Sequence, residues 1–299
     1  MALFQRKIDS IEDMLADIRK SCLYDEGLTK RMVGVLNHDS LLHSDAIEED
    51  TSSLEHLRDL QQAWSFAEKN FDGELTHQFI LEVSQKIDPS NFRYRQGSVH
   101  ISNYDGQFRS GFNPAKVERE MDKLIVHVND NEDRPVLLRA SDLSLYGLFI
   151  HPFGDGNGRT FRLLHNLFLY HNGIPPVVIK KAEKRPYKML VAAADGGFRE
   201  RSGQEEMFDN PSGGEVQYVG FMLDKVQESA EHLAKKYSKF REYSIDCYFR
   251  GSHKQIRGVR DFLRRQTSAG NWEFRSSVAR GSKTITVLTD ALRPLVDAS

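Results

Sequence analysis

Apolar side chains recur at helical spacing along the first 86 residues of the chain. They form two stripes with an apolar residue every three or four positions: Ile8, Ile11, Met14, Leu15 and Ile18, then Leu57, Leu60, Trp64 and Ala67. Such stripes are the buried faces of amphipathic helices. We therefore expect helices here whose apolar faces join the core.

The pattern changes over residues 91–112, NFRYRQGSVHISNYDGQFRSGF. Val99 and Ile101 alternate with polar neighbours, and glycine-containing turns follow, which is the pattern of a β-hairpin. Asn113 and Pro114 then open another helix, because proline suits a first helical turn. The apolar face of that helix would carry Val117, Met121, Leu124 and Ile125.

Further helices are predicted after this point. A strongly apolar helix over residues 143–150 runs into His151. Two others lie around residues 182–195 and 214–240, and the polar stretch RERSGQEEMFDNPSGGE between them predicts a long loop.

The C-terminal stretch has a different composition, because from residue 231 onward Lys and Arg outnumber Asp and Glu about two to one. It predicts a helical segment over residues 256–263, two strands, NWEFRSSV and KTITVLT, joined by the turn ARGS, and a short final helix. The predicted fold is mostly α, with a small β-hairpin and a C-terminal α+β extension. We divide it into an N-terminal helical region (1–90), a core (91–242) and a basic extension (243–299).

Composition excludes several classes of protein. The 299 residues carry a formal net charge of −2, which gives no general attraction to nucleic acid or to an anionic membrane. Cys22 and Cys247 are too few for a disulfide framework or a thiolate metal site, so a reducing, cytoplasmic setting is the simplest expectation. The N-terminus lacks the apolar region of a secretion signal, and no stretch reaches the roughly 20 apolar residues of a membrane helix.

The segment HPFGDGNGRTFR, residues 151–162, holds the candidate chemistry. Gly154, Gly156 and Gly158 alternate just before a predicted helix, where glycine lets backbone amides approach a ligand closely. The N-terminus of that helix has unpaired amides and the positive end of the helix dipole. Together these features predict an anion site of the kind that binds phosphates.

Charged side chains around this loop strengthen the prediction. Arg159 and Arg162 are three residues apart, so both lie on one helix face and suit a polyphosphate. Asp155 offers the single carboxylate that Mg²⁺ on a nucleotide usually takes from a protein. His151, with a pKa near neutrality, can accept a proton from an attacking hydroxyl.

These twelve residues resemble the signature of the Fic family, H-x-F-x-[DE]-G-N-G-R-x-x-R, at every specified position. A less specific sequence resemblance to the family extends from about residue 44 to about residue 197. It implies a Fic-type helical bundle that moves AMP from ATP onto a Ser, Thr or Tyr hydroxyl of a target protein or of itself. ATP is then the substrate and Mg²⁺ or Mn²⁺ the metal.

The resemblance also implies a role for each signature residue. His151 deprotonates the acceptor hydroxyl, and Asp155 binds the metal on the α and β phosphates. Asn157, with the amides of Gly156 and Gly158, cradles the phosphates. Arg159 binds the diphosphate and Arg162 the γ end, and Phe153 is a buried packing residue.

Two other segments resemble parts of the family outside the signature. YRQGSVHI followed by FNPAKVEREM is similar to the hairpin called the flap and the helix after it, so Val99, His100 and Ile101 would hold the target by strand-like pairing. A scaffold role is the alternative for this hairpin. KRPYKMLVAAADG resembles the segment after the signature helix, where Tyr187 would line the nucleotide pocket.

Ser44-Asp45-Ala46-Ile47-Glu48 resembles the inhibitory motif of many Fic proteins, [ST]-x-x-x-E-[GN]. Glu48 would then pair with Arg162 and block productive binding of the γ phosphate, and such a protein can also reverse the modification. The sequence departs from the motif at Glu49. Two alternatives stay open: Glu55 has the same spacing after Thr51, or SDAIEED is an acidic helix cap on a solvated face.

Other functions remain alternatives at this stage. The same fold can transfer a different nucleotide or a phosphate, and a regulator can use a Fic scaffold to bind DNA or a partner. The basic extension, with Arg275, Arg280 and Lys283, is compatible with a winged DNA-binding module. A lid or homodimer element is at least as compatible, so nucleic acid is not the expected partner.

Overall fold

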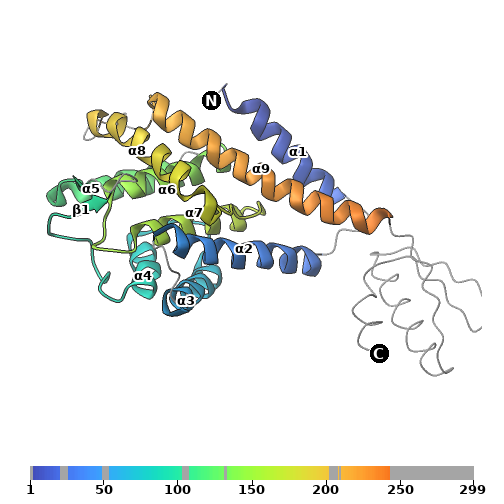
Figure 1. The fold of residues 1–299 in the computed structure, drawn as a ribbon, viewed down its shortest axis with the longest axis horizontal. Helices are drawn as coiled ribbons and strands as arrows, with labels where there is room; N and C mark the ends of the chain where they lie inside the picture. The colour runs from blue at the N-terminus through green and yellow to red at the C-terminus, as the bar shows by residue number, and fades with distance from the viewer. Residues whose placement is uncertain are drawn as a thin grey trace, which may run out of the picture. The chain divides into compact units, whose positions relative to one another are not determined.

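A computed structural model describes residues 3–20, 26–48, 54–102, 108–130, 133–201, 208 and 210–242 (Figure 1). The elements predicted after residue 242, which are compatible with a winged module or with a lid or homodimer element, lie outside the described residues. The chain divides into two compact units. One unit comprises Met1–Ile11 with Val33–Ser229, and the other Glu12–Met32 with Ala230–Ser299.

The described part of the chain is helical apart from one hairpin, which confirms a mostly α fold. Its α-helices are α1 (Gln5–Lys20), α2 (Glu26–Glu48), α3 (Leu54–Asn70), α4 (His77–Ile87), α5 (Val117–Asn129), α6 (Val136–Ile150), α7 (Asn157–His171), α8 (Lys184–Arg201) and α9 (Gly213–Glu242). Two short 3₁₀ helices, η1 (Pro114–Lys116) and η2 (Lys181–Glu183), precede α5 and α8. Within the described residues no helix is long and apolar enough to cross a membrane.

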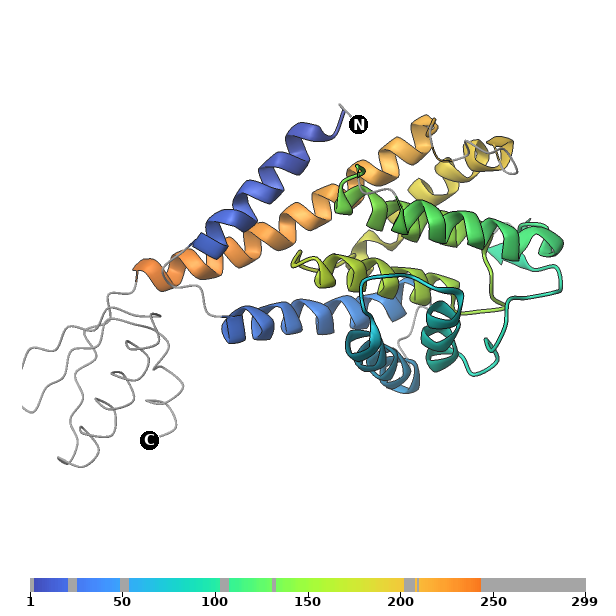
Figure 2. The ribbon, with the colours of Figure 1, turned by 180° about the vertical axis from the view of Figure 1, so that it is seen from behind.

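Helices α6 and α7 form the centre of the first unit and lie side by side in both views (Figures 1 and 2). Every residue of α6 except Val136 and Arg139 is buried, because α5 and α7 both pack against it. Helices α3 and α4 pack against α7 as well. The turn between α6 and α7 is the signature loop, so the most buried pair of helices positions the candidate chemistry.

The predicted hairpin is present as β1 (His100–Ser102) and β2 (Phe108–Ser110). The strands are antiparallel, with Ile101 opposite Arg109. The helix predicted from Asn113 and Pro114 also forms, and the Asn113 side chain accepts a hydrogen bond from the amide of Ala115 (3.0 Å). The apolar residues predicted for the face of α5 are all buried.

The polar loop predicted over residues 199–215 is wrong at both ends, and at its far end α9 already begins at Gly213. The polar loop was expected to begin at Arg199, but α8 continues to Arg201. Arg199 pairs with Asp195 one turn earlier (2.6 Å), and Arg201 donates two 2.6 Å hydrogen bonds to the buried carboxylate of Glu215 in α9. These ion pairs stabilise the last turn of α8, in a segment whose polar composition predicts a loop.

Candidate active site

His151 lies at the C-terminal cap of α6 in the left-handed conformation (φ 52°, ψ 60°). A non-glycine residue in this conformation costs roughly 1–2 kcal/mol, so its surroundings must hold it there. Its amide donates to the carbonyl of Gly147 (3.0 Å), and its ring Nδ1 lies 3.2 Å from the carbonyl oxygen of Leu148. Because a carbonyl only accepts, Nδ1 carries the proton and Nε2 is the nitrogen that can act as a base.

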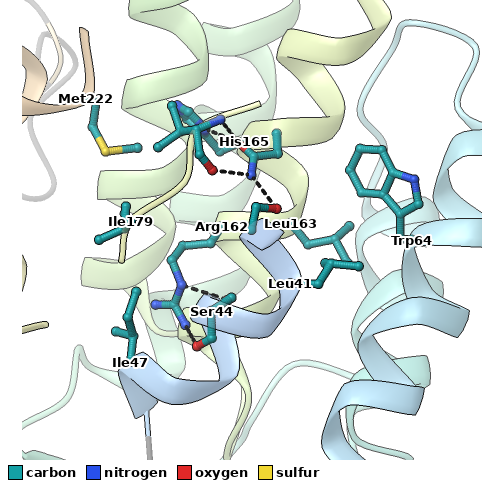
Figure 3. Close-up of a pocket in the computed structure, with 12 residues that line it drawn as sticks. Leu41, Ser44, Ile47, Trp64, Arg162, Leu163, His165, Ile179 and Met222 are labelled. Atoms are coloured by element: carbon teal, nitrogen blue, oxygen red, sulfur yellow. Dashed lines mark hydrogen bonds between the residues drawn. The ribbon is translucent and has the colours of Figure 1, made fainter. Parts of the chain in front are cut away.

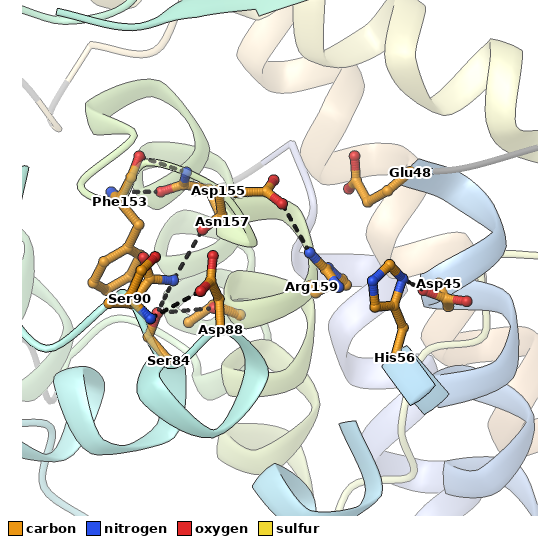
Figure 4. A network of polar contacts seen from close by, with 12 residues as sticks. Asp45, Glu48, His56, Ser84, Asp88, Ser90, Phe153, Asp155, Asn157 and Arg159 are labelled. Carbon is orange, nitrogen blue, oxygen red and sulfur yellow. Dashed lines mark hydrogen bonds and ion pairs between the residues drawn. The ribbon is translucent and has the colours of Figure 1, made fainter. Parts of the chain in front are cut away.

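The loop after His151 is held by side-chain amides (Figure 4). Asn157 bonds both the amide (2.9 Å) and the carbonyl (3.0 Å) of Phe153, and Asn91 donates to the carbonyl of Asp155 (3.0 Å). Gly156 caps the N-terminus of α7 at a φ of +75°, which favours glycine. The Asn157 side chain therefore shapes the loop, and any phosphate contact from this residue would come through its backbone amide.

Asp155 carries the most exposed charge of the loop. Its side chain is 79% exposed, and one carboxylate oxygen lies 3.2 Å from Nη2 of Arg159. No group of three or more His, Cys, Asp or Glu side chains in the described residues could hold a metal ion. A single exposed carboxylate beside an anion site nevertheless fits a metal that arrives on nucleotide phosphates, because such a metal takes most of its ligands from phosphate and water.

The two signature arginines are buried on α7, and Figure 3 shows the surroundings of the second. Arg162 is 6% exposed and donates to the hydroxyl and the carbonyl of Ser44, both at 2.9 Å. Its guanidinium lies 5.9 Å from the centre of the Tyr187 ring. Tyr187 is itself buried and lies next to Arg162. A contact between Tyr187 and a nucleotide stays a prediction.

Glu48, the last residue of α2, forms an ion pair with Arg162 (2.7 Å) and is 33% exposed. A Cβ atom added to Gly158 would lie 1.8 Å from the Glu48 carboxylate, so that carboxylate lies against the first turn of α7. Burial alone would raise the pKa of Glu48, but Arg162, Lys188 and Arg159 outweigh it and hold the pKa below its ordinary value. A carboxylate thus lies where the sequence predicts a phosphate.

Comparison with known proteins agrees with this geometry. Residues 53–169 match the Fic/DOC family. The chain contains a Fic domain. It is 32% identical to "Protein adenylyltransferase Fic" of Nematostella vectensis over 127 residues, which are 40% of this chain and 27% of that protein. A protein of the same name in Drosophila ananassae is 50% identical over 130 residues, 42% of this chain and 25% of that protein.

The likeness extends to the fold outside the matched region. A Fic-domain-containing signaling protein of Bacteroides thetaiotaomicron has a TM-score of 0.67 at 20% identity, over 78% of this chain and 97% of that one. At this identity the comparison concerns the fold alone. The chain spans about a quarter of the length of the curated relatives named above.

Around the Fic domain, contacts that the sequence did not predict hold the end of α2. Asp45, which is buried, lies 3.3 Å from Nδ1 of His56 in α3. One turn earlier, Ser40 accepts a hydrogen bond from Asn166 of α7 (3.2 Å). The signal for these contacts was present in the sequence as polar residues at helical spacing between the apolar positions of α2.

The sequence left two alternatives to an inhibitory Glu48: Glu55 in its place, or a solvated acidic face. Glu55 lies in the first turn of α3 and is exposed, and Thr51 lies outside the described residues. Ser44, Asp45 and Ile47 are buried, which argues against a purely solvated SDAIEED face. The hairpin residues Val99 and Ile101 are half-buried and His100 is exposed, so part of β1 is accessible.

Proposed function

We propose that this Fic domain is a protein adenylyltransferase that moves AMP from ATP onto a protein hydroxyl. One observation carries the proposal: a histidine whose Nδ1 faces a main-chain carbonyl, an exposed carboxylate, a helix N-terminus and two buried arginines meet around a single loop. The names of the curated relatives support the same activity.

The reaction forms one bond and breaks one bond at the α phosphorus of ATP. The acceptor oxygen attacks that phosphorus while its proton passes to Nε2 of His151, and the bond to the bridging oxygen of pyrophosphate breaks. The protein then carries AMP through a phosphodiester, and pyrophosphate leaves. Arg159, Arg162 and the amides at the start of α7 stabilise the phosphate charge, which is most of the catalysis in such transfers.

Asp155 would hold Mg²⁺ or Mn²⁺ that enters with ATP. The metal would neutralise charge on the α and β phosphates. In the structure the Asp155 carboxylate bonds Arg159, and the exposure of the carboxylate to solvent weakens that bond. The carboxylate can thus exchange this partner for the metal.

The hairpin would present the target. The outer side of β1 at Val99, His100 and Ile101 would pair with an extended segment of the acceptor protein, and main-chain pairing would align its hydroxyl with His151. Such pairing depends little on the side chains of the target. The identity of the target protein would then be set by surfaces beyond the hairpin.

Glu48 would inhibit this reaction. Its carboxylate occupies both Arg162 and the space against Gly158, which are the groups that would receive the γ phosphate. Nucleotide bound beside it would have its α phosphorus turned away from the acceptor, and in-line geometry is what the transfer needs. Arg162 is shielded from solvent, so the pair is stronger than an ordinary surface salt bridge.

ATP labelled at either the α or the γ phosphate distinguishes this function from its alternatives. We expect the α label, and not the γ label, to appear on protein when the Glu48→Gly variant is incubated with cell extract. Transfer of the γ label would instead indicate a kinase-like reaction. Absence of both labels from all proteins, with folded enzyme and metal present, would favour a Fic scaffold that acts as a regulator.

A further inference from the structure

Arg95 is a buried arginine in the segment that precedes the hairpin, and it is 8% exposed. Its guanidinium donates hydrogen bonds to the main-chain carbonyls of His151 (2.6 Å), Phe112 (2.6 Å), Gly97 (2.9 Å) and Ile150 (3.4 Å). Each of these bonds ends on backbone, not on an acidic side chain. The planar group therefore holds the course of the main chain at several points at once.

The carbonyls belong to two functional parts of the Fic domain. Gly97 and Phe112 flank the hairpin, one before β1 and one after β2. Ile150 and His151 are the end of α6 and the proposed base. The amide of Arg95 adds a bond to the carbonyl of Pro152 (2.9 Å), so one residue connects both ends of the hairpin with the loop of the base.

This connection acts where the backbone is under strain. In the described part of the chain, His151 is the one non-glycine residue with a positive φ. One of the two shortest bonds from Arg95 ends on the carbonyl of that residue, on the C-terminal side of its strained φ and ψ angles. A bond at this point resists rotation of the peptide that aims the imidazole.

Arginine is suited to this task and lysine is not. Four carbonyls around one plane match the fixed fork of a guanidinium, whereas an ammonium group has three donors on a point charge. Burial lowers the pKa of Arg95, as expected for a cation compensated only by carbonyl dipoles. A substitution that kept only the charge would leave carbonyls unpaired at one end or the other.

We propose that Arg95 is a positioning residue for AMP transfer, which couples the hairpin that receives the target to the backbone that orients His151. The proposal rests on the proposed function. It predicts that loss of Arg95 affects the acceptor side of the reaction and not the nucleotide side, because Arg159 and Arg162 lie on α7 and make separate contacts.

The test uses the full chain with Glu48→Gly as the parent, so that transfer is measurable. Arg95→Lys and Arg95→Ala are compared with Arg93→Ala, which removes an exposed arginine two residues earlier. We expect kcat to fall by about 30- to 100-fold in both Arg95 variants, since a misplacement of about 1 Å can cost that much. KM for the target should rise and the Kd for ATP should stay within about twofold, while Arg93→Ala matches the parent.

A rescue experiment separates positioning from general instability. Guanidinium ion at millimolar, non-denaturing concentration should restore much of the transfer by Arg95→Ala and leave Arg95→Lys and the parent unchanged. Equal loss of ATP affinity and kcat, or no rescue by guanidinium in a folded variant, would show that Arg95 only supports the fold. Wild-type kcat in both Arg95 variants would also overturn the proposal.

Spectroscopy keeps this test independent of the proposed function. In chain labelled with ¹⁵N-histidine, Arg95→Lys should shift the ring signals of His151, and amide exchange at Ile101 and Ser110 should accelerate. If the parent transfers no AMP yet these changes appear, the proposed function fails and the coupling stands. If the parent is active and neither change appears, the coupling fails and the function stands.

Discussion

His151 combines the strained cap of α6 with a ring whose Nδ1 faces the Leu148 carbonyl. Because Nδ1 carries the proton in that arrangement, Nε2 is the nitrogen that would take the acceptor proton. His151→Ala should therefore abolish transfer, by about 10²- to 10⁴-fold, the usual loss for a general base. The Kd for ATP and the melting temperature should change little.

Initial rates of α-label transfer, with ATP affinity measured by calorimetry, test this assignment. Transfer by His151→Ala at the rate of its parent would show that another group removes the proton. Loss of ATP binding together with transfer would place His151 among the nucleotide contacts instead.

The depressed pKa of Glu48 makes a prediction about pH. A carboxylate whose pKa is lowered in the folded protein keeps its pair above the ordinary value of 4.5, and loses it only as pH falls through the lowered value. Activation by Glu48→Gln, expressed as the ratio of its rate to the wild-type rate, should thus be nearly constant from about pH 6.5 to 8.5.

A control addresses the neighbouring histidine. Because His56 faces Asp45 one turn before Glu48, the ratio is measured again in the His56→Gln background, where the same constancy is expected. A ratio that falls toward one on acidification in both backgrounds would mean that the Glu48 carboxylate titrates near neutrality.

We expect the metal dependence of transfer to rest on one residue, Asp155. Transfer should require Mg²⁺ or Mn²⁺ and stop in excess chelator, and Asp155→Ala should reduce it by a similar factor because its carboxylate is the one exposed anion of the loop. Asp88→Ala, at the cap of α4, serves as a control acidic residue. Full activity in chelator would exclude the proposed metal role.

At the scale of elements, the contacts of α2 with α3 and α7 would hold it in the inhibitory position that we propose. His56→Ala removes the partner of Asp45 without touching Arg162, so it should loosen the end of α2 and raise transfer by about 2- to 10-fold, the value of one such interaction. Arg58→Ala, an exposed change in the same helix, should have no effect. Equal rates for the two variants would show that the Asp45–His56 pair does not hold α2 in place.

The sequence predicted most elements because their periodicity is local. The stripe of α5, the alternation around Val99 and Ile101 and the proline before α5 all appear in the structure. The end of α8 was missed because it depends on Glu215 of α9, which is distant in sequence. Periodicity contains no information about such partners.

At the scale of the molecule, the signature predicted which residues gather but not what supports them. Phe153 is buried as expected, and Arg162 and Glu48 are paired across 114 positions of sequence. The supports, Asn91 for the loop and Arg95 for the base, bond main-chain carbonyls. Every residue type has a main-chain carbonyl, so no sequence motif predicts these contacts.

The central claim is that one site transfers AMP and that Glu48 restrains it. The most direct measurement is the mass of purified chain and the rate of α-label incorporation after incubation with ATP and Mg²⁺. Four forms are compared: wild type, Glu48→Gly, Glu55→Gly, and Glu48→Gly combined with His151→Ala. We expect Glu48→Gly to gain AMP at least about tenfold faster than wild type and Glu55→Gly, which corresponds to about 1.4 kcal/mol, and the double variant to gain none. Unchanged incorporation in Glu48→Gly, or incorporation that persists without His151, would contradict the account.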